Sequence, residues 1–396
     1  MPGFFGIGLQ DHLAEMEPSS FSSDIISGLP QNIIETILCL VPIRDAVRTS
    51  ILAKKWRNSW NKIPKLVFNE DDMFDNSEEK SVLLLHEGSI LEFSLSMNAD
   101  DNCIEIGQII TYLSRKNTVK KLTLAFDGDS TYDLPRLTSF FLNSIQTPEE
   151  EVIDFVSKSP LLKSFSMKHS WWFTCDSMWK LLAYIPAIEY LYLFSVALRF
   201  DDDESCLPEL PTPLVHLKYA HLVDEYLTSS EGLPFVVFLI KNSPNLEKLK
   251  LESSCFFPGI SGIDPLTVKE YSDIWLKHLK ELELSFVANK MPNLEVLKLI
   301  MARSPMLKEV NILIGYEIDK DEETEMLRVL SDTQRASGMV KINVERLAAP
   351  ESSTEDDEDP ESSTDNEDPE SSTDDEYFDI YEDDDLLKYH LYLGGN

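Results

Sequence analysis

The chain has 396 residues, 43% of them hydrophobic, and a formal net charge of −35 at pH 7. This length allows two or three domains or one elongated array of repeats. The acidity argues against nucleic acid as a partner, because such binding rests on neutralising phosphates with Lys and Arg; basic proteins are compatible instead. No apolar run approaches the ~20 residues that a membrane-spanning helix needs, so no membrane partner is expected.

Residues 1–22 show no sustained hydrophobic period and are expected to form a flexible leader. The stretch from Asp24 to Trp60 then carries three short apolar patterns at helical spacing. They consist of Ile33, Ile34, Ile37, Leu38 and Val41, then of Ala46, Val47, Ile51 and Leu52, and finally of Trp56 and Trp60. Three helices of this size form too small a core to be stable alone, so another surface must cover the leftover apolar face.

Short motifs in this stretch match a known family: Ser27-Gly28-Leu29-Pro30, Ile37-Leu38, and residues 45–50 and 52–57. They resemble the plant F-box over residues 23–65. The sequence departs from the family mildly, with Gln31-Asn32 in place of an acid and Ala53 in place of a Ser. The resemblance implies a trihelical module that docks on a Skp1-like adaptor and, through it, on a cullin-RING ubiquitin ligase. The alternative interpretation is a small helical cap that seals the end of a larger domain.

The resemblance also implies which side chains meet the adaptor. The docking surface would consist of Leu29, Pro30, Ile33, Ile37, Leu38 and Pro42. Three further residues would lie partly in the core of the module and partly in the interface: Val47, Leu52 and Trp56.

A strand-forming pattern recurs through the middle of the chain, after a short strand expected at residues 64–68. It reads apolar, two residues, apolar, one residue, apolar, and the last two apolar positions share one face of a strand. The repeats begin at Ile90, Val119, Leu137, Leu162, Ile188, Leu214, Leu246, Leu279 and Leu307. Most intervals are typical of leucine-rich repeats, each a strand with a returning helix. The shorter interval before Leu137 indicates either a shortened repeat or a wrongly assigned strand.

Helical patterns lie between these strands, at residues 149–157, 177–184, 233–241 and 293–302. Three of them end in Ser-Pro, at Ser159-Pro160, Ser243-Pro244 and Ser304-Pro305, and Ser-Pro ends a helix and directs the chain into the next strand. The sequence Leu294-x-x-Leu297-x-Leu299 also fits the strand pattern, but its continuation at helical spacing favours a helix.

A second resemblance rests on residues 82–90, on Tyr132-Asp133-Leu134-Pro135 and on residues 330–337. These segments are similar to the plant F-box/FBD/LRR-repeat proteins. The likeness implies a leucine-rich-repeat region over residues 66–292 and an FBD-like C-terminal module over residues 293–347. The sequence departs from the family just after Pro135, where members usually carry further repeats.

The character of the chain changes at residues 348–396. This segment contains three copies of Pro-Glu-Ser-Ser-Thr and is dense in Asp and Glu. Few apolar residues and much like charge predict a disordered acidic tail. Six Ser and Thr residues of this segment are each followed, three positions later, by Asp or Glu. They are therefore candidate sites for an acidophilic kinase: Ser352, Thr354, Ser362, Thr364, Ser371 and Thr373.

The motifs of catalysis and metal binding are missing from the sequence. The five cysteines are odd in number and widely spaced, which favours the nucleus and/or cytoplasm over an oxidising compartment. The histidines lie in no catalytic or metal-ligand motif, and His216 and His221 are expected on the surface. The cluster Trp171-Trp172-Phe173 is either core packing or an aromatic anchor for a target protein. We expect no enzyme activity, cofactor or metal.

The sequence therefore predicts an α/β repeat fold: a short trihelical F-box, a leucine-rich-repeat solenoid arc and a disordered acidic tail. The predicted function is that of a substrate-recognition subunit of an SCF-type (cullin-RING) ubiquitin ligase, which binds a Skp1-like adaptor and an unknown target protein. One alternative is a repeat scaffold that holds basic proteins through its acidic tail. A further alternative is a receptor that has kept its adaptor and lost its target.

Overall fold

The computed structural model places most of the chain between residues 25 and 347. The described ranges are 25–68, 82–83, 85–96, 103–125, 134–143, 148–170, 173–196, 209–224, 232–253, 275–286, 294–316 and 318–347. By its internal contacts the chain divides into two units, Met1–Ala349 and Pro350–Asn396, and all described residues belong to the first. The candidate phosphorylation sites lie outside the described residues. Among those residues, no helix is both long and apolar enough to cross a membrane.

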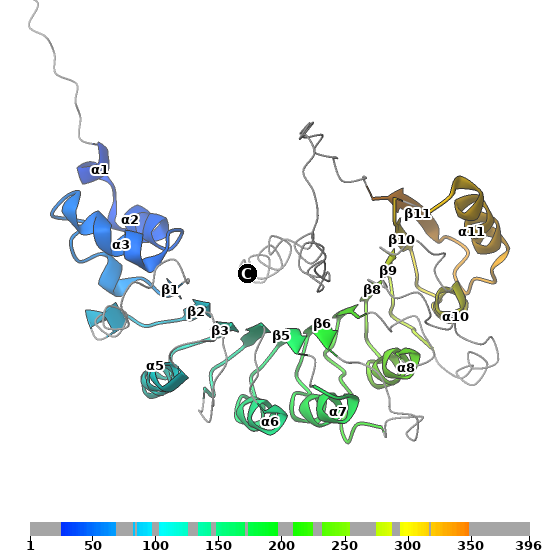
Figure 1. The fold of residues 1–396 in the computed structure, drawn as a ribbon, viewed down its shortest axis with the longest axis horizontal. Coiled ribbons are helices and arrows are strands. Elements are labelled where there is room, and N and C mark those ends of the chain that lie inside the picture. The colour runs from blue at the N-terminus through cyan, green and yellow to red at the C-terminus, as the bar shows by residue number, and fades with distance from the viewer. Residues whose placement is uncertain are drawn as a thin grey trace, which may run out of the picture. The chain divides into compact units, whose positions relative to one another are not determined.

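The first described elements are short helices (Figure 1). Helix α1 (Ile25–Gly28) is followed by α2 (Gln31–Leu38), which starts after Pro30, and by α3 (Ile43–Arg48), which starts after Pro42. Each proline precedes the first helical residue with an extended backbone, so its ring ends one segment and starts the next. Two 3-10 helices, Thr49–Ile51 and Trp60–Lys62, lead into the first strand.

The strands form one eleven-stranded parallel sheet, and its strand order is the order in the sequence. The strands are β1 (Lys65–Phe68), β2 (Glu92–Ser96), β3 (Lys121–Ala125), β4 (Ser139–Asn143), β5 (Ser164–Ser170), β6 (Tyr190–Val196), β7 (Tyr219–Val223), β8 (Lys248–Ser253), β9 (Glu281–Phe286), β10 (Glu309–Ile314) and β11 (Lys341–Arg346). Both β3 and β4 exist and pair in parallel, so the interval before Leu137 is a shortened repeat rather than a wrong strand. The predicted fold class is confirmed.

The returning helices cover one side of this sheet, as Figure 1 shows. They are α5 (Cys103–Lys116), α6 (Glu149–Ser157), α7 (Cys175–Tyr184), α8 (Leu233–Asn242), α10 (Leu294–Arg303) and α11 (Lys320–Asp332). The segment around Leu297 is helical, as its continued spacing predicts. The sequence patterns did not predict α5 or α11.

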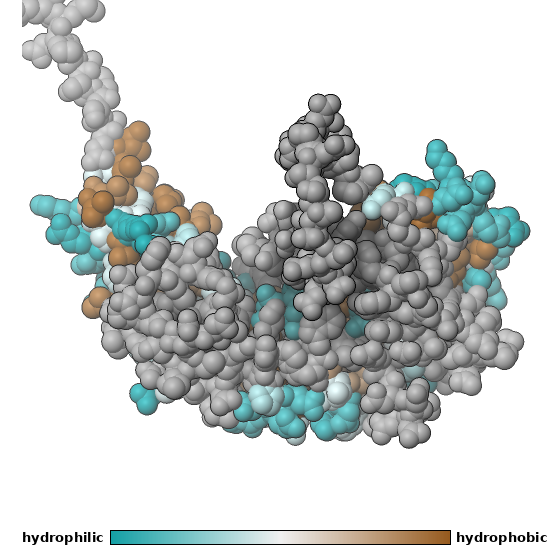
Figure 2. Space-filling model, viewed as in Figure 1, coloured by the Kyte–Doolittle hydropathy of each residue, from teal (hydrophilic) through white to brown (hydrophobic). Residues whose placement is uncertain are grey.

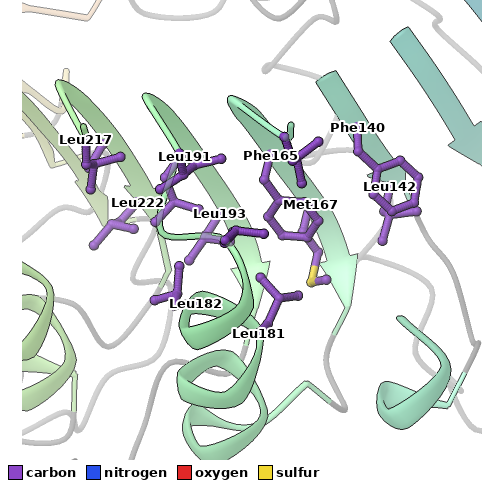
Figure 3. Close-up of a cluster of buried hydrophobic side chains, with 14 of the residues drawn as sticks. Phe140, Leu142, Phe165, Met167, Leu181, Leu182, Leu191, Leu193, Leu217 and Leu222 are labelled. Carbon is purple, nitrogen blue, oxygen red and sulfur yellow. The ribbon is translucent and has the colours of Figure 1, made fainter. Parts of the chain in front are cut away.

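The core lies between the sheet and these helices. Because each strand pairs in register with the next, equivalent apolar residues align in two rows across the sheet. The rows are Phe93, Leu122, Phe140, Phe165, Leu191, Ala220, Leu249, Leu282 and Val310, and Leu95, Leu124, Leu142, Met167, Leu193, Leu222, Leu251, Leu284 and Ile312, all buried. Figure 3 shows part of both rows facing Leu181 and Leu182 of α7. Side chains of one repeat are thus covered by those of its neighbours.

The Ser-Pro motifs form the same turn in three repeats. Ser159, Ser243 and Ser304 are buried, and each carbonyl oxygen accepts a hydrogen bond from the backbone N–H three residues on, at 3.1, 3.2 and 3.3 Å. The residues that donate are the first apolar residues of the repeats that follow, at Leu162, Leu246 and Leu307. The turn therefore fixes where each returning helix ends and where the next strand pattern begins.

Candidate functional site

Helix α2 has two apolar faces rather than one. Ile34 and Leu38, four residues apart, are fully buried in the helical module. Ile33 and Ile37 follow the same spacing on the adjacent face and remain 41% and 36% exposed. The apolar pattern of this helix is therefore wider than the module can bury, and half of it is left at the surface.

Two hydrogen bonds attach the beginning of the module to the turn segment between its two 3-10 helices. Trp56 is buried, and its indole N–H donates to the carbonyl oxygen of Ile26 at 3.1 Å. The Lys55 ammonium donates to the carbonyl oxygen of Leu29. These bonds hold α1 and the turn before α2 in place, so the side chains beside them are displayed by a fixed backbone.

The exposed apolar residues of the module form a set that we call the apolar face. It consists of Ile25, Ile26, Ile33, Ile37, Leu40, Ile51 and Leu52, which are between 36% and 89% exposed. In Figure 2 these residues contribute to the brown area over the helical module. Apolar patches of this kind on folded proteins mark interaction sites for other proteins.

The residues assigned to the docking surface from the sequence differ in how exposed they are. Pro30, Ile33, Ile37 and Leu52 are exposed, and Leu29, Pro42 and Val47 are partly buried. Leu38 and Trp56 lie in the core, so placing Leu38 on the docking surface was wrong. The reason is that helical spacing cannot show which of two adjacent faces turns inward. Four further apolar residues of the module are exposed and were not part of the prediction: Ile25, Ile26, Leu40 and Ile51.

The helical module is joined tightly to the repeat sheet. The backbone N–H groups of Glu87 and Gly88 both donate to the carbonyl oxygen of Asn61, at 2.8 and 3.0 Å. The buried ring of His86 bonds through Nε2 to the Ile63 carbonyl oxygen at 2.9 Å, and burial lowers its pKa. A Cβ atom at Gly88 would lie 2.7 Å from the carbonyl oxygen of Lys62, so only glycine fits there. The motif at residues 82–90 is therefore a structural junction.

The side of the sheet away from the helices presents the other residues of each strand. Its middle is rich in aromatic side chains that touch one another. Tyr192 meets the edge of the His221 ring, with centroids 4.5 Å apart, and stacks beside Phe194 at 6.5 Å. Phe173 is not part of this surface, because it is 1% exposed and belongs to the core, which excludes it as an aromatic anchor for a target. Trp171 and Trp172 lie outside the described residues.

A buried ionic cluster adjoins these rings. Nε2 of His221 bonds to the Glu252 carboxylate at 2.9 Å, and the Lys250 ammonium bonds to the same carboxylate. Burial raises the pKa of Glu252, but the bonds from His221 and Lys250 outweigh it and bring the pKa down to about 2. Burial lowers the pKa of His221. The expectation of a surface His221 was therefore wrong, because the residue lies inside β7 beside a carboxylate of β8.

In the described part of the chain, no group of three or more His, Cys, Asp or Glu residues could hold a metal ion. Burial raises the pKa of the Cys39 thiol. The structure thus offers two surfaces for consideration: the apolar face and the aromatic side of the sheet.

Comparisons with known proteins identify a domain family and several relatives of this chain. Residues 26–68 match the F-box domain family. The chain is 26% identical over 416 residues to an F-box/FBD/LRR-repeat protein of Arabidopsis thaliana, covering 81% of this chain and 98% of that protein. Another Arabidopsis thaliana F-box/FBD/LRR-repeat protein is 32% identical over 148 residues, covering 33% of this chain and 32% of that one. Among solved structures, a chain of the Rad7–Elc1 complex in yeast aligns with a TM-score of 0.38 and 13% identity, over 81% of this chain and 89% of that chain.

Proposed function

We propose that this chain, an F-box protein related to the F-box/FBD/LRR-repeat proteins of plants, is a substrate-recognition subunit of an SCF-type ubiquitin ligase. The F-box binds a Skp1-like adaptor, and the adaptor connects the chain to the cullin-RING ligase. The repeat sheet binds a target protein. Family members are typically non-catalytic subunits, so other subunits transfer ubiquitin. The contribution of this chain is to bring the target close to them, which raises its effective concentration.

The observation that supports this proposal most directly is the apolar face. Its residues belong to the segment that matches the F-box family, apart from Ile25 directly before it. Each large apolar side chain that moves from water into an interface contributes about 1.5–3 kcal/mol when it is fully buried. A partner that covers Ile33, Ile37 and Ile51 therefore gains binding energy from apolar surface that the free chain leaves exposed to water.

Binding to a purified Skp1-like adaptor, followed by isothermal titration calorimetry, tests the proposal. The double variant Ile37→Ser with Ile51→Ser removes two members of the apolar face without changing the core. Because buried apolar anchors dominate interfaces, we expect its affinity for the adaptor to fall by about tenfold or more. Circular dichroism and thermal unfolding should show that the double variant remains folded.

Met339→Ser is the matched control for this experiment. Met339 is 90% exposed and lies beside β11, far along the chain from the F-box. Its replacement removes one large exposed apolar side chain outside the F-box, and we expect unchanged affinity for the adaptor. Unchanged affinity in the folded Ile37→Ser, Ile51→Ser variant would reject the apolar face as the adaptor site.

A further inference from the structure

The two edges of the sheet differ in how far they are covered. At the first edge, Leu66 and Phe68 of β1 are buried, and α3 of the F-box packs against this strand. At the other edge, Ile342 and Val344 of β11 continue the two core rows but are only half-buried. Among the described residues, no strand follows β11 in the sheet (Figure 1). The apolar side chains of β11 therefore lack the cover that a next repeat would give them.

The hydrogen bonds of β11 show which of its backbone groups face outwards. The N–H groups of Lys341 and Leu347 donate to carbonyl oxygens of the preceding repeat, at 2.8 and 2.9 Å. Successive residues of a strand direct their backbone groups to opposite sides, so those of Ile342 and Val344 point away from β10. Such outward N–H and C=O groups can pair with a further strand.

Exposed apolar side chains gather at the same edge. Met339, two residues before β11, is 90% exposed, and Leu327 of α11 is 44% exposed. Val329 of α11 lines a groove with residues of α10, whereas Glu323 pairs with Arg346 of β11 at 2.6 Å. Leu327 follows Glu323 by four residues and so shares its flank of the helix. This flank of α11 is therefore the one next to β11 and its free edge.

The sequence of β11 is complementary to itself when two copies run antiparallel. If Asn343 of each copy lies on the twofold axis, Lys341 of one copy faces Glu345 of the other. In the same arrangement Ile342 faces Val344, and these are the residues whose backbone groups point outwards. Opposite charges and β-branched apolar side chains are favourable cross-strand pairs.

Other alignments of the two strands lose this match. The outward backbone groups can pair again only after a shift of two residues. One such shift places Glu345 opposite Met339, and the other places Lys341 opposite Leu347, so that a charge faces an apolar side chain. Lys341 and Glu345 are exposed, and within the described part of the chain neither forms an ion pair. Both charges are thus available to a second copy.

We propose that two copies of this chain form a symmetric dimer in which their β11 strands pair antiparallel and join the two sheets. Ile342 and Val344 of each copy then cover those of the other, and Leu327 and Met339 add apolar surface beside them. An interface of this small size predicts a dissociation constant in the micromolar range. Because the F-box lies at the opposite edge of the sheet, the apolar face of each copy stays free for an adaptor.

Analytical ultracentrifugation of the full chain tests the dimer, at an ionic strength that screens the repulsion between two chains of charge −35. We expect the average mass to rise from that of the 45.2 kDa monomer towards twice that value with concentration. Val344→Pro removes an N–H that points away from β10, so the sheet keeps its own bonds. This variant should remain folded in thermal unfolding and dimerise about tenfold more weakly. A monomer throughout the micromolar range would overturn the inference.

Two charge reversals test the alignment of the strands. In Lys341→Glu, two pairs of glutamates face each other across the dimer, and in Glu345→Lys two pairs of lysines do so. Each variant alone should dimerise about tenfold more weakly than the unmodified chain. Mixed in equal amounts, the two variants should recover its affinity, because every glutamate then faces a lysine. Failure of the mixture to recover would overturn the proposed pairing.

Lys277→Glu is the matched control. It makes the same change in charge as Lys341→Glu at an exposed position before β9, and dimerisation should change by less than about twofold. Equal weakening by Lys277→Glu, or a dimer that Val344→Pro and the charge reversals leave intact, would overturn the inference. Adaptor binding is measured separately, so a monomeric chain that binds the adaptor would contradict the dimer alone and leave the proposed function standing.

Discussion

The F-box and the repeat sheet differ in how completely they bury their apolar side chains. In the sheet, each of the strands β1 to β10 contributes at least two core residues, and neighbouring strands and helices cover them, as at Leu191 and Leu193. In the F-box, α2 buries Ile34 and Leu38 but leaves Ile33 and Ile37 at the surface. The apolar side chains of one repeat are covered by the neighbouring repeats, whereas a small module has too small an interior to bury all of its apolar side chains. The uncovered surface is what makes the F-box suited to binding another protein.

The two regions are nevertheless a single folded unit. Their junction consists of hydrogen bonds from Glu87, Gly88 and His86 to the segment at residues 61–63, directly before β1. Strand β1 then pairs with β2 in the same register as the rest of the sheet. Because the apolar face and the repeat sheet share this continuous backbone, the two are held in a defined arrangement.

The largest effect on stability is expected in the sheet, where burial is complete. Phe165 is fully buried on β5, and its ring centroid lies 6.1 Å from that of Phe140 on β4. Phe165→Ala leaves a cavity between two repeats and should lower the free energy of unfolding by about 3–5 kcal/mol. Urea unfolding followed by circular dichroism measures the loss. Tyr184→Ala is the control, because Tyr184 is an aromatic residue of α7 that is 53% exposed; an equal loss there would contradict the prediction.

Two neighbouring residues of α2 allow a buried and an exposed apolar side chain to be compared within the F-box itself. Leu38→Ala removes a fully buried side chain and should lower the free energy of unfolding by about 3 kcal/mol. Ile37→Ala changes the exposed face, and we expect a loss of about 1 kcal/mol or less. Adaptor affinity should respond in the opposite order among molecules that remain folded, with the weaker binding in Ile37→Ala. If Ile37→Ala destabilised the protein as much as Leu38→Ala, the division of α2 into two faces would be wrong.

The same comparison explains how far sequence reasoning could go. The repeat strands were predictable because a strand has a period of two, so residues such as Phe165 and Met167 must share one face. The inward side of α2 was less predictable, since Ile33, Ile34, Ile37 and Leu38 form one broad stripe in which helical spacing fits either face. His221 was misplaced because the sequence does not reveal that Glu252 lies beside it on the next strand. Phe173 could be assigned to the core or to the surface, because its neighbours in sequence do not show that it joins the core.

The two regions also differ in whether their ion pairs are exposed or buried. This difference predicts how the stability of the chain depends on pH. In the F-box, the ion pair of Arg48 with Asp45 is exposed, with 61% and 56% of the two side chains accessible. In the sheet, Glu252 and His221 are buried together, and Lys250 completes the cluster. Exposed pairs contribute little to stability, whereas a buried carboxylate depends on its partners and on its ionisation. Acid should therefore weaken the sheet through Glu252.

The direction in which stability changes with pH follows from the pKa of Glu252, which is about 2 in the folded chain and 4.5 for an unperturbed glutamate. Its stabilising contribution is complete above pH 4.5 and is lost as the pH falls towards 2, with a loss of about 2 kcal/mol by pH 3. The lowered pKa of His221 acts in the same direction from about pH 6.5 downwards, because the unfolded chain takes up that proton first.

The variant Glu252→Gln tests this prediction. We expect its free energy of unfolding to decrease less between pH 4.5 and 3 than that of the unmodified chain, by about 2 kcal/mol. Urea unfolding at pH 7, 4.5 and 3 measures it, with Glu325→Gln as the control at an exposed ion pair on α11. Equal acid sensitivity of Glu252→Gln and the unmodified chain would show that the buried cluster does not control the stability of the sheet at low pH.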